Sequence, residues 1–126
     1  MLRLMLRLLV GLIGLLALFM AARLWLDPTS TALKLGLMTQ AVLGQATARA
    51  DLGGFFGVVG ALAVLASIRS DGSRLTVPVF LIGAALTGRV ITAIVSGISP
   101  PLVPPMVVEA VILVVFVAAW RNLRTA

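Results

Sequence analysis

The chain of 126 residues contains no cysteine, no histidine and no tyrosine. Without cysteine and histidine it cannot form a disulfide, a thiolate nucleophile, a zinc site of the usual kind or a haem site with His or Cys ligands. Catalysis by a histidine base, alone or beside a serine, is excluded for the same reason. Carboxylates remain as the acids and bases, so an enzyme is the least favoured function class, and we expect neither a cofactor nor a metal.

Charge is also scarce, because only 11% of the residues are charged while 61% are apolar, and the mean hydropathy is +1.19. A soluble domain usually carries about a quarter charged residues, and disordered chains are poor in apolar residues. The composition therefore predicts an all-α membrane protein. Since one crossing needs about 20 apolar residues, a chain of this length accommodates a bundle of four transmembrane helices as a single domain, residues 1–126.

The hydropathy pattern divides the chain into four apolar runs. The predicted helices span Leu4–Leu26, Asp51–Ile68, Val77–Ser96 and Met106–Trp120. The first run follows Arg3 and Arg7 and so has some features of a signal peptide. It is long enough to span a bilayer, however, and we interpret it as an uncleaved helix. Pro28 pushes Asp27 out of helical geometry and is expected to end it.

Prolines also mark the boundaries of the third and fourth predicted helices. Thr76 is a candidate N-cap for the third helix, with Pro78 in its first turn. The segment Gly97–Pro105 contains four prolines, which can start a helix but cannot continue one. Because the fourth predicted helix is short for a span, we expect it either to be tilted little or to begin within this proline segment.

The segment Thr29–Ala48 is more polar than the rest of the chain and makes a poor spanning helix. At about 20 residues it is also too long for a plain loop in a compact bundle. We predict an interfacial amphipathic segment between the first two spanning helices. A polar extension of the second spanning helix, which would account for the residues up to 50, is the alternative.

The net charge of +6 would suggest nucleic acid as the partner of a soluble protein, but here the basic residues lie between apolar runs. Such residues mark the cytoplasmic side of a membrane protein, and we expect no nucleic-acid partner. Six arginines and Asp71 give one side of a four-helix protein a charge of +5, and the other side carries +1. The six arginines are Arg3, Arg7, Arg69, Arg74, Arg121 and Arg124. Both termini are therefore predicted to be cytoplasmic in a bacterial inner membrane.

Five charged residues are not explained by this topology and are expected in the outer half of the bundle. They are Arg23, Arg49, Asp51, Arg89 and Glu109. A charge at the membrane centre costs about 2.5 to 3.5 kcal/mol, so these side chains should face the bundle interior. Arg89 and Glu109 are at similar depth on successive helices, and the planar guanidinium suits a carboxylate, which predicts an ion pair.

The five candidates together carry three positive and two negative charges. The surplus positive charge favours an anion-bearing ligand in this outer cluster. A purely structural pair that fixes helix register is one alternative. Proton transfer by Glu109 or Asp51 is another.

Small residues recur at helical spacing in the second spanning helix. Gly53, Gly57 and Ala61 form a small-xxx-small row, which allows the close approach of another helix in lipid. We interpret this row as packing within one bundle, with a dimer seam as the alternative.

The block Arg49–Phe56, with the sequence RADLGGFF, resembles the opening of the second helix in the small bacterial membrane proteins of domain-of-unknown-function family 4345. Asp27-Pro28 after the first helix, Arg89 in the third and Glu109 early in the fourth extend the resemblance over nearly the whole chain. It implies a four-helix inner-membrane protein and brings no activity with it.

These patterns lead to one preferred function and two alternatives. We expect an integral membrane protein that binds a lipid headgroup or a small anionic amphiphile in a polar pocket on the outer side. Its partners would be membrane lipids. An accessory subunit of a larger membrane complex, or a small transporter that functions as a homodimer, are the alternatives.

Overall fold

The computed structural model describes residues 1–39 and 41–123, and within these ranges all regular secondary structure is helical. The elements in chain order are α1 (Leu2–Leu26), α2 (Pro28–Lys34), α3 (Val42–Thr47), the π-helical turn η1 (Ala48–Leu52), α4 (Gly53–Arg69), the 3-10 turn η2 (Gly72–Leu75), α5 (Thr76–Ser96), the 3-10 turn η3 (Pro100–Leu102) and α6 (Val103–Asn122). Four helical stretches are long and apolar enough to cross a membrane, as the sequence predicts. The chain is therefore built as a multi-pass membrane protein.

The first spanning helix ends where Asp27-Pro28 predicts, because α1 stops at Leu26 and the Asp27 side chain accepts a hydrogen bond from the Ser30 amide at 3.3 Å. This carboxylate caps the N-terminus of α2. Likewise, α6 begins inside the proline segment, so Pro104 and Pro105 lie in its first turn. Proline is tolerated there because an amide proton at that position would have no acceptor within the helix.

The predicted N-cap role of Thr76 is wrong. Thr76 is the first residue of α5, and its hydroxyl Oγ1 donates to the Ser73 carbonyl at 2.8 Å instead of accepting from an amide of α5. The reason is that η2 already winds the chain before α5, so the residue before Thr76 has helical backbone angles as well.

The first part of the segment Thr29–Ala48 is separate from the second spanning helix, and its last part is the polar extension of that helix. The first part begins in the short helix α2, and Gly36 then turns the chain with φ 84°. From Val42 onward, α3, η1 and α4 form one continuous helical stretch of 28 residues, so the polar extension of the second spanning helix is present. The predicted start of that helix at Asp51 is too late, since polar residues outside the apolar run continue the helix without interrupting it.

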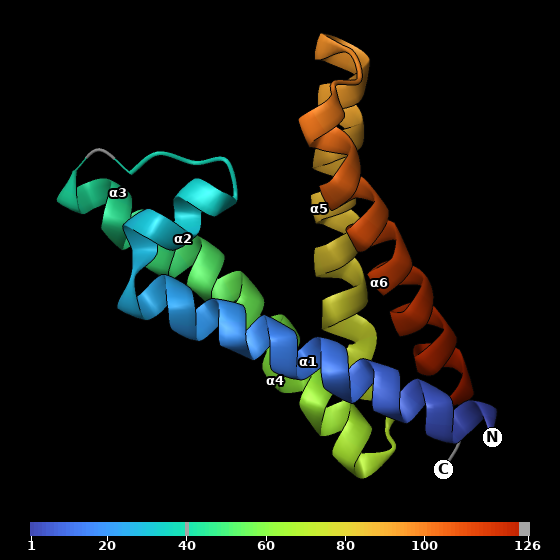
Figure 1. Cartoon of the computed structure of the whole chain (residues 1–126). Helices are drawn as coiled ribbons and strands as arrows, with labels where there is room; N and C mark the ends of the chain where they lie inside the picture. Colours follow the sequence, from blue (N-terminus) through green and yellow to red (C-terminus); the bar gives the residue numbers. More distant parts are fainter. Residues whose placement is uncertain (40, 124–126) are drawn as a thin grey trace.

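The four long helices form two hairpins, α1 with α4 and α5 with α6. The two helices of the α1–α4 hairpin pack more closely than those of the α5–α6 hairpin. Figure 1 shows α1 and α4 side by side along most of their length, whereas α5 and α6 approach them only near the start of α1 and the end of α6. The buried apolar core lies where the two hairpins meet. It consists of Leu6, Val10, Val59, Ala63, Ala66, Leu75, Ile82, Phe116, Ala119 and Leu123. Away from this core the hairpins diverge, so the bundle is open at the opposite end.

We call the end of the molecule where the two hairpins meet the closed end. Arginines of α1 join the helices there. Arg7 donates from Nε to the Ser67 carbonyl at 2.9 Å and from Nη2 to the Ile68 carbonyl at 3.3 Å. Arg3 donates from Nη1 to the Asn122 carbonyl at 2.8 Å. Carbonyls in the last turn of a helix lack intrahelical partners, and cations near them also interact favourably with the helix dipole. The start of α1 thus joins the ends of α4 and α6.

The turn between α4 and η2 lies at the same end of the molecule, because the Gly72 amide donates to the Leu123 carbonyl at 3.2 Å. The Asp71 carboxylate accepts hydrogen bonds from Ser73, at 2.6 Å from the hydroxyl and 3.1 Å from the amide. These bonds, and the nearby Arg74 guanidinium, stabilise the ionised carboxylate and lower the pKa of Asp71. The closed end is therefore held by polar contacts of the α4–η2 turn as well as by the arginines of α1.

Glycines set the distance between α1 and α4. A Cβ atom on Gly60 would lie 2.8 Å from the Gly14 carbonyl oxygen, and one on Gly14 would lie 2.9 Å from the Val64 amide nitrogen. The predicted small-residue row also packs within the chain, because Gly53 and Gly57 face the Trp25 ring of α1. Packing within one bundle, rather than a dimer seam, accounts for these two glycines.

We expect Gly60→Val to destabilise the protein by about 1 to 3 kcal/mol, because the larger side chain must push the α1 backbone away. The free energy of unfolding in a mixed-detergent titration measures this effect. Gly83→Val is the matched control, since a Cβ atom there meets nothing within 4 Å. Equal destabilisation by both variants would contradict the close α1–α4 contact.

Candidate functional site

An ion pair links α5 and α6 in the diverging half of the molecule. The Nε atom of Arg89 donates to Oε1 of Glu109 at 2.7 Å, which confirms the predicted pairing. The Glu109 side chain is 15% exposed and that of Arg89 is 37% exposed, so the carboxylate is the more enclosed partner. A charge-assisted hydrogen bond of this length is among the stronger polar contacts in proteins.

The pair lies well inside the apolar stretches that carry it. Arg89 precedes the end of α5 by seven residues and Glu109 follows the start of α6 by six. At a rise of 1.5 Å per residue, both lie about 9 to 11 Å from the open end of their helices. Because isolated charges are costly at such a depth, mutual neutralisation is the expected arrangement.

A cavity of about 550 Å³, lined mainly by apolar residues but containing this pair, lies between the two hairpins. We call it the charged cavity. Its walls include Asp51, Phe55 and Phe56 from the continuous helix and Leu81, Arg89 and Glu109 from the α5–α6 hairpin. Three of the five charged residues predicted for the site are therefore brought to one cavity by both hairpins.

A second cavity, of about 360 Å³, lies closer to the core and has an almost entirely apolar lining. We call it the apolar cavity. Met20 of α1, Val59 of α4, Ile82 of α5 and Val108 of α6 all line it, so every long helix contributes. Phe56 lines both this cavity and the charged one. The two cavities therefore adjoin at Phe56, and only the charged cavity contains charged residues.

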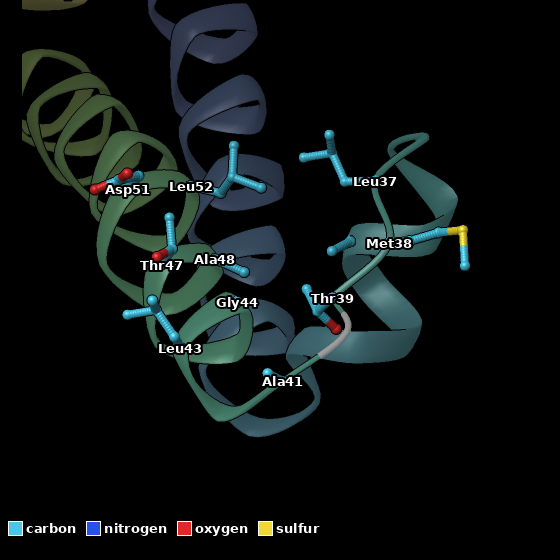
Figure 2. Close-up of a pocket in the computed structure, with 11 residues that line it drawn as sticks. Leu37, Met38, Thr39, Ala41, Leu43, Gly44, Thr47, Ala48, Asp51 and Leu52 are labelled. Carbon is cyan, nitrogen blue, oxygen red and sulfur yellow. The ribbon is translucent and has the colours of Figure 1, made fainter.

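A third cavity, of about 600 Å³, lies between the segment after α2 and the start of the continuous helix, and Figure 2 shows it. We call it the outer cavity. Leu37 and Leu52 stand on facing sides of it, with Thr47 and Asp51 on the same helix as Leu52. Because Leu37, Asp51 and Leu52 also line the charged cavity, the two spaces are neighbours along that helix.

The remaining two predicted site residues lie elsewhere. The Arg49 side chain is exposed and donates from Nε to the Trp25 carbonyl at 2.9 Å, while Nε1 of Trp25 donates to the Arg49 carbonyl at 3.2 Å. This reciprocal contact ties the end of α1 to η1. Arg23 is partly exposed, and its carbonyl accepts from the Thr31 hydroxyl at 3.3 Å. Neither arginine is among the described residues that line the charged cavity.

This arrangement changes the charge balance expected for the site. The predicted surplus of positive charge depends on Arg23 and Arg49 joining the other three residues. The charged residues that line the cavity in the described part of the chain are Asp51, Arg89 and Glu109, with a formal sum of −1. The cavity thus contains one ion pair and one additional carboxylate.

Sequence reasoning missed the aromatic residues that organise the site. Trp25 occupies the space left by Gly53 and holds Arg49, while Phe55 and Phe56 pack edge to face with ring centroids 5.2 Å apart. The signal that favours a role for Phe55 and Phe56 is their place about one turn after Asp51, at four and five residues, in a helix otherwise rich in small residues.

No family model matches the sequence, and no curated protein and no solved structure matches it either. The functional assignment therefore depends on the geometry of the three adjoining cavities and their charged residues.

Replacing either partner of the ion pair leaves the other charge unpaired among apolar residues. Since Arg89 remains partly exposed, we expect Arg89→Gln and Glu109→Gln each to destabilise the protein by about 1 to 3 kcal/mol. The double variant should be less destabilised than the sum of the two. A double-mutant cycle on the free energy of unfolding measures the coupling, and strictly additive effects would disprove a stabilising pair.

Proposed function

We propose that this protein holds a membrane amphiphile between its two hairpins. The apolar cavity receives the hydrocarbon tail, and the charged cavity receives the polar head beside Arg89 and Glu109. The observation that carries the proposal is that these two cavities adjoin at Phe56, one almost entirely apolar and the other containing an ion pair among its apolar residues. An amphiphile has the same division between an apolar and a polar part.

The dimensions of the cavities support this function. Volumes of about 360 and 550 Å³ both lie in the range of about 300 to 1,000 Å³ that is usual for ligand sites. A membrane provides such ligands directly, because the hairpins diverge toward the open end and amphiphiles surround them. The resemblance of Arg49–Phe56 to domain-of-unknown-function family 4345 stays a prediction, and it is compatible with this proposal without adding an activity to it.

The ion pair leaves hydrogen-bonding capacity for a ligand. Arg89 has five N–H groups, and its Nε–H is the one bound to Glu109. In the described part of the chain no other acceptor is hydrogen-bonded to this guanidinium. The free N–H groups at Nη1 and Nη2 suit the ester or phosphate oxygens of an amphiphile.

We also propose that the closed end faces the cytoplasm of a bacterium and that the cavities open toward the outer side of its inner membrane. Five of the six arginines counted for the cytoplasmic side are close to the closed end: Arg3, Arg7, Arg69, Arg74 and Arg121. The sixth, Arg124, lies outside the described residues. An excess of arginine beside spanning helices favours the cytoplasmic side.

Filling the apolar cavity should expel the ligand. Val108 lines this cavity, so we expect Val108→Trp to reduce lipid retention several-fold because its indole occupies the space of the tail. Val107 is the matched control, since it precedes Val108, is 55% exposed like Val108 and is not among the residues that line the cavity. Native mass spectrometry after titration with vesicles of equal phosphatidylethanolamine and phosphatidylglycerol content measures retention.

Equal retention by wild type and Val108→Trp would contradict the proposal. So would a loss of the same size in Val107→Trp, because it would reflect general disturbance of α6. The same spectra report copy number and partners, and they therefore identify a homodimeric transporter or a subunit of a larger complex if either alternative holds.

The orientation is testable by labelling, because the chain contains no cysteine and single cysteines can be introduced without background. We expect Ser99→Cys, between α5 and α6, to react with a membrane-impermeant maleimide in spheroplasts. Ser73→Cys, at the closed end, should react only after the membrane is permeabilised. The reverse pattern would overturn the proposed orientation.

A further inference from the structure

We infer that the bound amphiphile is zwitterionic, with an ammonium group beside Asp51 and an anionic or carbonyl oxygen beside Arg89. This inference rests on the proposed function, because it names the class of head group that the charged cavity accepts. The residues that carry it are the three charged residues of that cavity, Asp51, Arg89 and Glu109.

The Asp51 carboxylate has no cationic partner in the described part of the chain. Within residues 1–39 and 41–123, no basic nitrogen lies within 4.0 Å of it, and it accepts no hydrogen bond from another side chain. Arg49 is close in sequence but is directed to the Trp25 carbonyl. Residues two apart in a helix point to nearly opposite faces, so Arg49 and Asp51 do not meet on the same side.

Asp51 is exposed and lines both the charged cavity and the outer cavity, so a ligand can reach its carboxylate. It shares a cavity with Glu109, which lies inside the apolar stretch of α6, and Phe55 and Phe56 flank it on the same helix. Attraction between charges grows as the surrounding dielectric constant falls, so a cation entering this cavity would be bound more strongly than at an aqueous surface. The Arg89 guanidinium is already engaged by Glu109 and does not neutralise Asp51.

The formal charge of −1 in the charged cavity favours head groups that contain a cation. A head group with net negative charge would add repulsion against Asp51 and Glu109. An ammonium group removes the imbalance by pairing with Asp51. The remaining N–H groups of Arg89 then bind the oxygen that accompanies the ammonium group in a zwitterion.

Aminophospholipids have both groups at the spacing of one short head group, and their acyl chains suit the neighbouring apolar cavity. A water-soluble zwitterion offers the same charges without a tail. The apolar cavity would add to the affinity for an aminophospholipid but not to that for a water-soluble zwitterion. A competition experiment between the two therefore distinguishes them.

The test uses the full chain in dodecyl maltoside, with dioctanoyl phosphatidylethanolamine and dioctanoyl phosphatidylglycerol as probes of identical acyl chains. Native mass spectrometry gives the affinity for each. We expect wild type to bind phosphatidylethanolamine about tenfold more tightly than phosphatidylglycerol. Asp51→Asn should remove most of this preference by weakening phosphatidylethanolamine alone. Asp51→Glu retains the charge and should keep the preference.

The matched control is Asp27→Asn, because Asp27 is exposed like Asp51 but lines neither the charged cavity nor the outer cavity. Its capping of α2 is preserved, since asparagine is an equally good N-cap. We expect this variant to bind both lipids like wild type. Excess phosphoethanolamine in solution should not displace the lipid, and displacement would assign the site to a soluble zwitterion.

The failures of the two proposals are distinguishable. Equal binding of both lipids by wild type, or an unchanged preference in Asp51→Asn, would overturn the zwitterion inference while leaving amphiphile binding intact. Tighter binding of phosphatidylglycerol that is lost in Arg89→Gln would replace it with an anionic ligand. Failure of wild type to bind either lipid would overturn the proposed function itself. The wild-type comparison needs no variant and decides the matter even if Asp51→Asn does not fold.

Discussion

The unequal packing of the two hairpins determines the rest of this structure. Small residues let α1 and α4 approach closely over most of their length, down to the contact between Gly14 and Gly60. The α5–α6 hairpin is joined to them mainly through the core at the arginine-rich end. Van der Waals packing drives helix association in lipid, so helices without close partners separate. The divergence that follows creates the space in which the charged and apolar cavities lie.

Within this framework the structural role of the Arg89–Glu109 pair is compatible with the ligand contact that we propose. The pair joins α5 to α6 in the half of the hairpin where the described structure buries few side chains, and so it fixes their register. It also presents unused N–H groups of a guanidinium to the neighbouring cavity. The structural pair and the proposed ligand contact would therefore use different atoms of the same arginine.

The sequence predicts the helices and the ion pair well because both depend on simple physical requirements. Apolar runs of sufficient length become spanning helices, and Arg89 and Glu109 at similar depth find each other because neither is stable alone in lipid. The proline segment likewise indicates where α6 begins.

The composition of the cavity could not be predicted in the same way. Counting charges treats Arg49 and Asp51 as members of one cluster, although the helix directs them to different faces and Trp25 provides a carbonyl for the arginine. The predicted helix start at Asp51 was also too late and the predicted N-cap at Thr76 was wrong, because a helix continues through polar residues and short turns that hydropathy does not register. The sign of the charge in the cavity depends on these local details.

The central claim is that an amphiphile lies between the hairpins, and photo-crosslinking tests it most directly. A phosphatidylethanolamine with a diazirine in its acyl chain can be incorporated into nanodiscs with the protein and mapped by peptide mass spectrometry. The account predicts adducts concentrated on Met20 and Ile112, which line the apolar cavity. Adducts confined to the outward-facing residues Phe80 and Ile94, which are 70% and 78% exposed, would show that lipid only surrounds the protein and would contradict the claim.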